Sequence, residues 1–103
     1  MGNFDLTREA AEDLYRIWEY TVDTWSEVQA DRYYAVLEEA FFTIASTPLK
    51  VGKPYDDIMP GLRALHIRRH MVFYFVQENA RVLIVRVLHE KMDYFRHIFY
   101  FKP

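Results

Sequence analysis

The first long segment with a regular hydrophobic pattern predicts an amphipathic helix. Its apolar and small residues recur every three or four positions, as on the buried face of a helix: Ala10, Leu14, Ile17 and Thr21. The charged residues between them, including Asp13, are predicted to face solvent. Thr7 precedes this segment and is a favoured N-cap residue. A helix is therefore predicted from about Arg8 to Thr24.

A second helix is predicted directly after the first. Ser26 and Gln29 fit a capping box, in which an N-cap serine is followed three residues later by Glu or Gln. The apolar stripe then continues through Ala30, Tyr33, Leu37, Phe41 and Ile44. Pro48 disfavours helical geometry at the residue before it, so the helix should end at about Ser46 or Thr47. Two helices with so short a joint are expected to pack as an antiparallel hairpin.

After Pro48 the pattern changes to one typical of loops and strands. Residues 49–61 contain two glycines and two prolines and are predicted to form a loop. Three strands are predicted at 62–68, 71–77 and 81–89, joined by links at 69–70 and 78–80. With a short edge strand at 3–6, the order is β-α-α-β-β-β. The sequence thus predicts a single α+β domain over 1–103, with a helical hairpin packed on one face of a small, mostly antiparallel sheet.

Composition narrows the chemistry that is available. The chain has no cysteine, which excludes a disulfide scaffold, a thiolate metal site and a thiol nucleophile. Its three glycines are too far apart for a phosphate-binding loop. The longest apolar run, Met71 to Val76, is far too short to span a membrane, and the N-terminus does not resemble a secretory signal. We therefore expect a cytoplasmic protein with no cofactor and no membrane partner.

Charge is distributed unevenly along the chain. Residues 1–60 carry five basic and twelve acidic side chains, a balance of −7, whereas residues 61–103 carry eight basic and three acidic ones, a balance of +5. All four histidines also lie in the second part. The positive half offers a face for an acidic protein segment or a phosphate backbone, although a basic but merely solvated surface has the same composition.

Titratable groups gather at the end of the last predicted strand, in the run from Arg86 to His97. Strand alternation places Arg86 on one face with Val82, Ile84 and Leu88, which predicts a paired, half-covered charge. His89, Asp93 and His97 are spaced four apart, so on a helix they would share one face, where such a set can bind zinc. The alternative is an ordinary helix end without a fourth ligand, and no metal site is predicted.

Metal-free cleavage of a phosphate ester would require a general acid, a general base and cations. The side chains that supply such groups are His66, His70, His89, Arg63, Arg68, Arg86 and Arg96. Strand alternation argues against their convergence, because His66 lies on the face opposite Leu65 and Ile67. No catalytic residue is predicted from this set.

Aromatic residues crowd the predicted helical hairpin. They are Tyr15, Trp18, Tyr20, Trp25, Tyr33, Tyr34, Phe41 and Phe42. A sheet of this size cannot cover all of them, so some are expected to form an exposed patch of the kind that anchors protein partners. Stacking on single-stranded bases is disfavoured, because these rings lie in the acidic half of the chain.

The order of motifs resembles the ParE toxins of the RelE/ParE superfamily over nearly the whole chain. The matching stretches are Leu6-Thr7, Ala10-Ala11-Glu12-Asp13-Leu14, Ile17, Tyr20, Gln29-Ala30, Tyr33, Pro60-Gly61-Leu62-Arg63, His70-Met71-Val72-Phe73-Tyr74, Arg86-Val87-Leu88-His89 and Met92-Asp93. The last two are the most specific. The resemblance implies the toxin of a type II toxin–antitoxin module that inhibits DNA gyrase by binding, without catalysis of its own.

The resemblance also implies a cognate ParD-like antitoxin, which neutralises the toxin in a hetero-oligomeric complex. We expect no direct sequence-specific binding to nucleic acid. The basic C-terminal half is expected to contact gyrase near one end of the sheet, through Arg63, His89, Lys91, Asp93 and Arg96. The antitoxin is expected to be acidic, to fold on binding and to bury aromatic anchors of the hairpin, namely Trp18, Trp25 and Tyr33.

Two other functions stay open at this point. The RelE-like branch of the superfamily consists of ribosome-dependent mRNA endonucleases, and His70, Glu90 and Arg96 occupy three positions where those enzymes carry catalytic groups. An acid such as Glu90 is a poor fit where transition-state charge needs a cation, although His89 keeps the alternative open. The third reading is a toxin-like fold that serves only as a binding module. The run from Arg86 to His97 is then interpreted as a structural turn and a contact surface, in which Arg86, His89 and Asp93 set the path of the tail.

Overall fold

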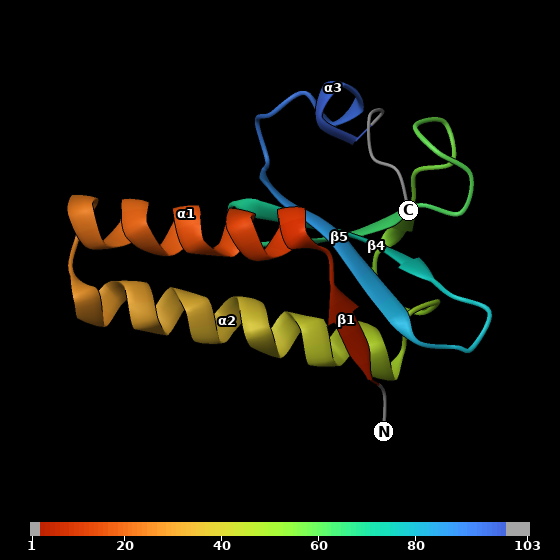
Figure 1. Cartoon of the computed structure of the whole chain (residues 1–103), viewed down its shortest axis with the longest axis horizontal. Coiled ribbons are helices and arrows are strands. Elements are labelled where there is room, and N and C mark those ends of the chain that lie inside the picture. The colour runs from red at the N-terminus through yellow and green to blue at the C-terminus, as the bar shows by residue number, and fades with distance from the viewer. Residues whose placement is uncertain (1–2, 99–103) are drawn as a thin grey trace.

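The computed structural model describes residues 3–98, which form an α+β fold (Figure 1). In chain order the elements are β1 (Phe4–Leu6), α1 (Arg8–Thr24), α2 (Glu27–Ser46), β2 (Lys53–Pro54), β3 (Arg63–Ile67), β4 (His70–Val76), β5 (Val82–His89) and α3 (Tyr94–Ile98). The predicted fold class and helix bounds are confirmed. Two elements were not predicted: the two-residue β2 inside the expected loop, and the single helical turn α3 in the tail.

Side-chain capping defines where the two long helices begin. The Thr7 hydroxyl accepts a hydrogen bond from the Ala10 N–H at 3.0 Å and donates one to the Val85 carbonyl at 2.8 Å. The Ser26 hydroxyl accepts from the Gln29 N–H at 3.0 Å. These bonds satisfy N–H groups that have no partner inside the helix. Thr7 also fixes the start of α1 against β5.

The two helices lie side by side and antiparallel, as predicted. Figure 1 shows that the end of the hairpin where α1 passes into α2 extends beyond the sheet, whereas the other end covers it. The hairpin is therefore only partly supported by the strands. No helix within residues 3–98 is long and apolar enough to cross a lipid bilayer.

The sheet has five strands in the order β1-β5-β4-β3-β2. β1 runs parallel to β5, and all other neighbours are antiparallel. β4 is therefore central. Its residues Met71 to Tyr74 are all buried, which confirms the prediction of a strand covered on both faces.

A register shift between β4 and β5 changes which β5 residues share a face. Phe73 pairs with Arg86 and Tyr74 with Ile84, so Val85 has no direct partner across the ladder. Val87 packs into the core beneath the helices, whereas Val85 in the bulge and Leu88 after it pack into the core on the opposite face. The prediction that Leu88 shares a face with Ile84 is therefore wrong, because strict alternation does not survive a bulge.

Each face of the sheet has its own hydrophobic core. The core beneath the helices includes Leu14, Leu37, Phe41, Ile44, Val72, Tyr74 and Ile84. The core on the other face includes Leu62, Ala64, Met71, Phe73, Val85, Leu88 and Ile98. Ile98 of α3 and the neighbouring Tyr94 belong to the second core, so the tail is packed against the helix-free face.

The link between β3 and β4 is a two-residue turn made by Arg68 and Arg69. Ile67 pairs with His70 across the ladder, which places both residues in the strands. The predicted link at 69–70 is thus displaced by one residue. As a result, both arginines lie at the tip and His70 is drawn into the structure.

Candidate functional site

An open groove of about 930 Å³ lies between the hairpin and the end of the sheet; we call it the hairpin groove. It is lined from α1 by Asp13, Arg16, Ile17, Tyr20, Thr21 and Thr24, and from the joint and α2 by Trp25, Gln29 and Tyr33. The β3–β4 turn and the start of β4 contribute Arg69 and His70, and β5 and the tail contribute Arg86, Val87, Leu88, His89, Met92 and His97. The groove therefore brings together segments from nearly the whole length of the chain.

The lining combines apolar surface with basic side chains. Trp25, Tyr20 and Met92 are large, exposed side chains along its walls. Three arginines and three histidines also line it, whereas Asp13 is the one acidic residue among the lining residues. Such a surface suits a segment that presents apolar anchors together with carboxylates.

A network of aromatic rings forms one part of the lining. The Tyr33 hydroxyl lies 2.6 Å from Nδ1 of His70 and also accepts a weak hydrogen bond from the Arg69 N–H at 3.4 Å. The His70 ring meets the His89 ring edge to face, at 5.5 Å between centroids. Burial, with the neighbouring His89, lowers the pKa of His70 to about 4, whereas burial raises the pKa of Tyr33. At neutral pH the His70 ring is therefore neutral, and its Nδ1 accepts the hydrogen bond that the Tyr33 hydroxyl donates.

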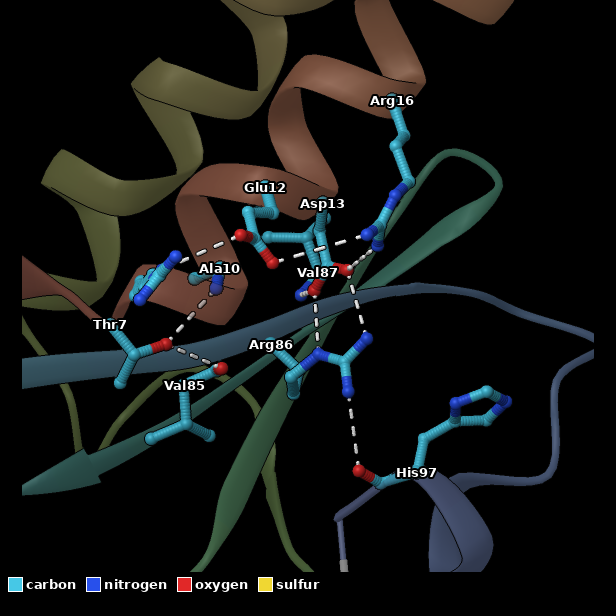
Figure 2. Close-up of polar contacts among 10 residues, drawn as sticks. Thr7, Ala10, Glu12, Asp13, Arg16, Val85, Arg86, Val87 and His97 are labelled. Atoms are coloured by element: carbon cyan, nitrogen blue, oxygen red, sulfur yellow. Dashed lines mark hydrogen bonds and ion pairs between the residues drawn. The ribbon is translucent and has the colours of Figure 1, made fainter. Parts of the chain in front are cut away.

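Asp13 and Arg86 form a forked ion pair beneath the groove (Figure 2). Arg86 donates from Nε and Nη2 to the two carboxylate oxygens of Asp13 at 2.8 and 2.9 Å, and the Val87 N–H donates to the same carboxylate at 3.0 Å. The third guanidinium nitrogen, Nη1, donates to the carbonyl of His97 at 3.2 Å. The hydrogen bonds to Asp13 raise the pKa of Arg86. One guanidinium therefore joins α1, β5 and α3.

Hydrogen bonds between residues close in the sequence set the path of the tail as it leaves β5. His89 Nδ1 accepts from the Lys91 N–H at 3.2 Å, and the Asp93 carboxylate accepts from the Arg96 N–H at 3.2 Å, which caps α3. The Tyr94 hydroxyl donates to the Glu90 carbonyl at 2.5 Å. These bonds confirm the interpretation that His89 and Asp93, together with Arg86, fix the tail.

A second, smaller cleft of about 740 Å³ opens where the tail meets β2 and β3; we call it the tail cleft. It is lined by Gly52, Lys53, Tyr55, Ala64, Leu65, His66, Met71, Glu90, Lys91 and Tyr94. Inside it, His66 Nε2 lies 2.9 Å from a carboxylate oxygen of Glu90. This contact is exposed, so it contributes little to stability.

The three aromatic residues predicted as partner anchors have different surroundings. Trp25 is 73% exposed at the end of the hairpin and lines the groove, and half-buried Tyr33 lines it as well. Trp18 lies on another side of α1, where its Nε1–H donates to Asp31 at 3.1 Å. The prediction of exposed aromatics on the hairpin is confirmed by Tyr15, Tyr20, Trp25, Tyr34 and Phe42.

The five residues predicted to lie near one end of the sheet do not all lie there. Arg63 starts β3 and pairs with Tyr74, whereas His89 is at the other end of the ladder, opposite His70. The Arg63 guanidinium instead donates to the carbonyls of Pro48 and Val51, both at 3.1 Å. Its placement with the tail residues is therefore wrong. Lys91, Asp93 and Arg96 are exposed on the tail that follows His89.

Of the groups considered for catalysis, His70, Arg86 and His89 line the hairpin groove together, whereas His66 lies in the tail cleft and Arg63 at the other end of β3. His70 is bonded to Tyr33 and Glu90 to His66, while Arg96 is exposed on α3; no hydrogen bond or ion pair joins any two of His70, Glu90 and Arg96 in the described residues. Within residues 3–98, no three His, Asp or Glu side chains are grouped closely enough to hold a metal ion.

Several members of the groove were not predicted from the sequence, Asp13 and Arg69 among them. Asp13 was predicted to face solvent, but its side chain is 6% exposed because the carboxylate is turned to Arg86. Its position among exposed acidic neighbours did not indicate burial, since its partner Arg86 is 73 residues away in the chain. Arg69 was expected only as part of a turn, and its contribution to the groove depends on how that turn meets α2.

Comparisons with known proteins agree with this geometry. The family described as "ParE toxin of type II toxin-antitoxin system, parDE" matches residues 4–94. Toxin ParE1 of Mycobacterium tuberculosis is 37% identical over 93 residues, covering 90% of this chain and 94% of the relative. Toxin ParE1 of Caulobacter vibrioides is 36% identical, with coverage of 95% and 99%.

Solved structures show the same fold. The chromosomal ParDE toxin–antitoxin system from P. aeruginosa aligns with a TM-score of 0.76 at 22% identity, covering 86% of this chain and 96% of the other. The toxin–antitoxin complex RelBE2 of Mycobacterium tuberculosis aligns with a TM-score of 0.62 at 25% identity, covering 85% and 96%. Together with the family match and the curated relatives, these likenesses show that the chain belongs to the ParE toxin family of type II toxin–antitoxin systems.

Proposed function

We propose that this protein is a cytoplasmic toxin that inhibits DNA gyrase by binding and is neutralised by a cognate ParD-like antitoxin in a hetero-oligomeric complex. Membership of the ParE family supports this proposal, as do the structural neighbours, which are a ParDE system and a RelBE2 complex. The hairpin groove is the observation that best supports binding of an antitoxin.

The hairpin groove suits an acidic segment that folds as it binds. Trp25, Tyr20 and Tyr33 offer aromatic surface for apolar anchors, and Arg69 offers a charge for a carboxylate. The Asp13 carboxylate does not repel such a segment, because Arg86 already neutralises it at 2.8 Å. Coupled folding lets a disordered antitoxin tail cover a large surface with moderate affinity per unit area.

The exposed tail is our candidate for the gyrase contact. Lys91 and Arg96 are exposed there, and Met92 and Phe95 add apolar surface that is 41% and 50% exposed. Asp93 and His89 hold this segment in place by hydrogen bonds to its backbone. Arg63 is not included, because its guanidinium donates hydrogen bonds to the carbonyls of Pro48 and Val51 in the loop after α2.

Binding rather than catalysis is favoured by the state of the candidate acid–base groups. The low pKa of His70 makes it a weak base at neutral pH, and its Nδ1 already lies 2.6 Å from the Tyr33 hydroxyl. Glu90 places an acid where cleavage of a phosphate ester requires a cation. A toxin that only traps an intermediate of another enzyme needs no such groups.

The decisive experiment is a gyrase supercoiling assay with relaxed plasmid and purified toxin, run with and without the antitoxin from the neighbouring reading frame. We expect the toxin to stop supercoiling and the antitoxin to restore it. In parallel, ribosomes programmed with mRNA are incubated with the toxin. Unaffected gyrase together with mRNA cleavage in the ribosomal A site would favour the RelE-like endonuclease. Normal cell growth on induction without antitoxin would favour an inert binding module.

A further inference from the structure

In the turn between β3 and β4, Arg68 has a backbone conformation that is unfavourable for any residue other than glycine. Arg68 has φ +55°, in the left-handed region that favours glycine. In a two-residue hairpin turn a positive φ at the first position alone is typical of glycine, and a residue with a Cβ costs about 1 kcal/mol or more there. Strain of this kind is often retained where a side chain has a function. The chain thus keeps an arginine where glycine would fit better.

The cations at this tip have no partners of their own. The side chains of Arg68, Arg69 and Lys91 form no ion pair or hydrogen bond within the part of the chain that the structure describes, and all three residues are exposed. The backbone at Lys91 lies close to the turn, because the N–H of the preceding Glu90 donates to the Arg69 carbonyl at 2.8 Å; Arg69 borders the hairpin groove and Lys91 the tail cleft. The Glu90 carboxylate is turned to His66 and is not paired with these cations. We call Arg68, Arg69 and Lys91 the cationic tip.

We propose that the cationic tip binds the phosphate backbone of duplex DNA without sequence specificity. Arginine and lysine side chains neutralise backbone phosphates and release condensed counterions, so a few unpaired cations at one tip are enough for weak binding. The net charge of the chain is −2, so general attraction to DNA is unfavourable and the affinity must arise locally. The proposal adds a contact to the proposed function and does not depend on it.

The shape and composition of the tip favour duplex DNA over the other anionic partners. Single-stranded nucleic acid is bound largely by stacking on exposed rings, and the exposed rings lie on α1, α2, α3 and the hairpin joint rather than on this turn. An acidic peptide with apolar anchors finds its complement in the hairpin groove. The turn residues Arg68 and Arg69 offer charge without an exposed aromatic ring, and the phosphate backbone of a duplex requires only charge.

The test is fluorescence anisotropy of a labelled 20-base-pair duplex titrated with purified toxin between 25 and 200 mM salt, conditions over which phosphate contacts weaken strongly. We expect a dissociation constant in the micromolar to submillimolar range at low salt and a salt slope of about −2 to −3, as for three phosphate contacts. The double variant Arg68→Gln, Arg69→Gln should lower the affinity about tenfold and reduce the slope by about two.

The matched control is the double variant Arg32→Gln, Lys50→Gln, which removes the same charge from exposed positions in the acidic part of the chain. It should bind the duplex within about twofold of the wild type. Absence of binding at 25 mM salt, an equal loss in the control, or preference for a single-stranded RNA of the same length would overturn the proposal.

The variant Arg68→Gly separates the proposed contact from a structural role. Glycine suits φ +55°, so the midpoint of urea unfolding should rise while the affinity for the duplex falls. A gain in stability with unchanged affinity for DNA would contradict the proposal. Because the assay contains no gyrase, its result is independent of whether the toxin inhibits that enzyme.

Discussion

Asp13 in α1 and Arg86 in β5 are 73 residues apart in the chain and form a forked ion pair with N···O distances of 2.8 and 2.9 Å. The side chains are only 6% and 16% exposed. Arg86 stands beside the bulge in β5, and its remaining nitrogen donates to the His97 carbonyl. The pair therefore links the hairpin, the sheet and the tail, which are the three parts that border the hairpin groove.

Removing the charge of Asp13 should strongly destabilise the protein. In Asp13→Asn the amide cannot accept from Arg86 and from the Val87 N–H as the carboxylate does, and a poorly solvated cation is left without its partner. Breaking a buried pair in this way costs about 3 kcal/mol in the free energy of unfolding, measured by urea denaturation. The control Glu12→Gln, an exposed neighbour, should change it by less than about 0.5 kcal/mol. A loss below about 1 kcal/mol for Asp13→Asn would show that the pair is not a main support of the fold.

The stability of the protein should depend on the protonation of His70. Its pKa is about 4 in the folded protein against an ordinary value of 6.5, because the ring is buried and faces His89; the charges of Glu90 and Asp13 act in the opposite direction. Between these two values the unfolded chain binds more protons, so the free energy of unfolding should fall as the pH drops from about 6.5 to 4.

Urea denaturation at pH 7, 6 and 5 measures this effect. The variant His70→Asn keeps an acceptor for the Tyr33 hydroxyl but cannot titrate, so its stability should change less over the same interval. Carboxylates that titrate contribute equally to both proteins and cancel in the comparison. An identical pH dependence in the two proteins would be inconsistent with the low pKa of His70.

Two glycines with the same backbone requirement should respond differently to alanine. Both have positive φ, +71° at Gly52 and +84° at Gly61, but a Cβ at Gly52 would lie 2.6 Å from the Ala64 carbonyl oxygen, whereas one at Gly61 meets nothing closer than 3.8 Å. Gly61→Ala should cost about 1 kcal/mol for the left-handed conformation alone. Gly52→Ala should cost about 3 kcal/mol or fail to fold, because a paired strand must move. Thermal unfolding of both variants measures the loss of stability. Equal losses in the two variants would contradict this prediction.

Trp25 should contribute to antitoxin binding and little to stability. It is 73% exposed, and Tyr15 on the same helical hairpin is 62% exposed but lies outside the groove. Trp25→Ala should weaken antitoxin binding by about tenfold or more, as for an aromatic anchor, whereas Tyr15→Ala should change it by less than about twofold. Isothermal titration calorimetry with the antitoxin measures both. Equal effects of the two variants would show that the antitoxin does not bind in the hairpin groove.

The sequence alone determined the features that depend on neighbouring residues. Thr7 and Ser26 cap the two helices through contacts three residues away, and Pro48 acts on the residue before it. Hydrophobic periodicity in turn identifies the buried face of each helix and the strongly apolar central strand. These local rules were sufficient for the fold class and for the family resemblance.

Only the tertiary structure decided which distant residues meet. The bulge at Val85 shifts the phase of β5, β2 pairs over two residues, and the carboxylate of Asp13 is buried because a guanidinium 73 residues away reaches it. None of these features has a local pattern, since a pairing between strands or a salt bridge is stabilised by partners that the neighbouring sequence does not specify. The hairpin groove follows from these pairings, because its walls come from both helices, a turn, the end of β5 and the tail.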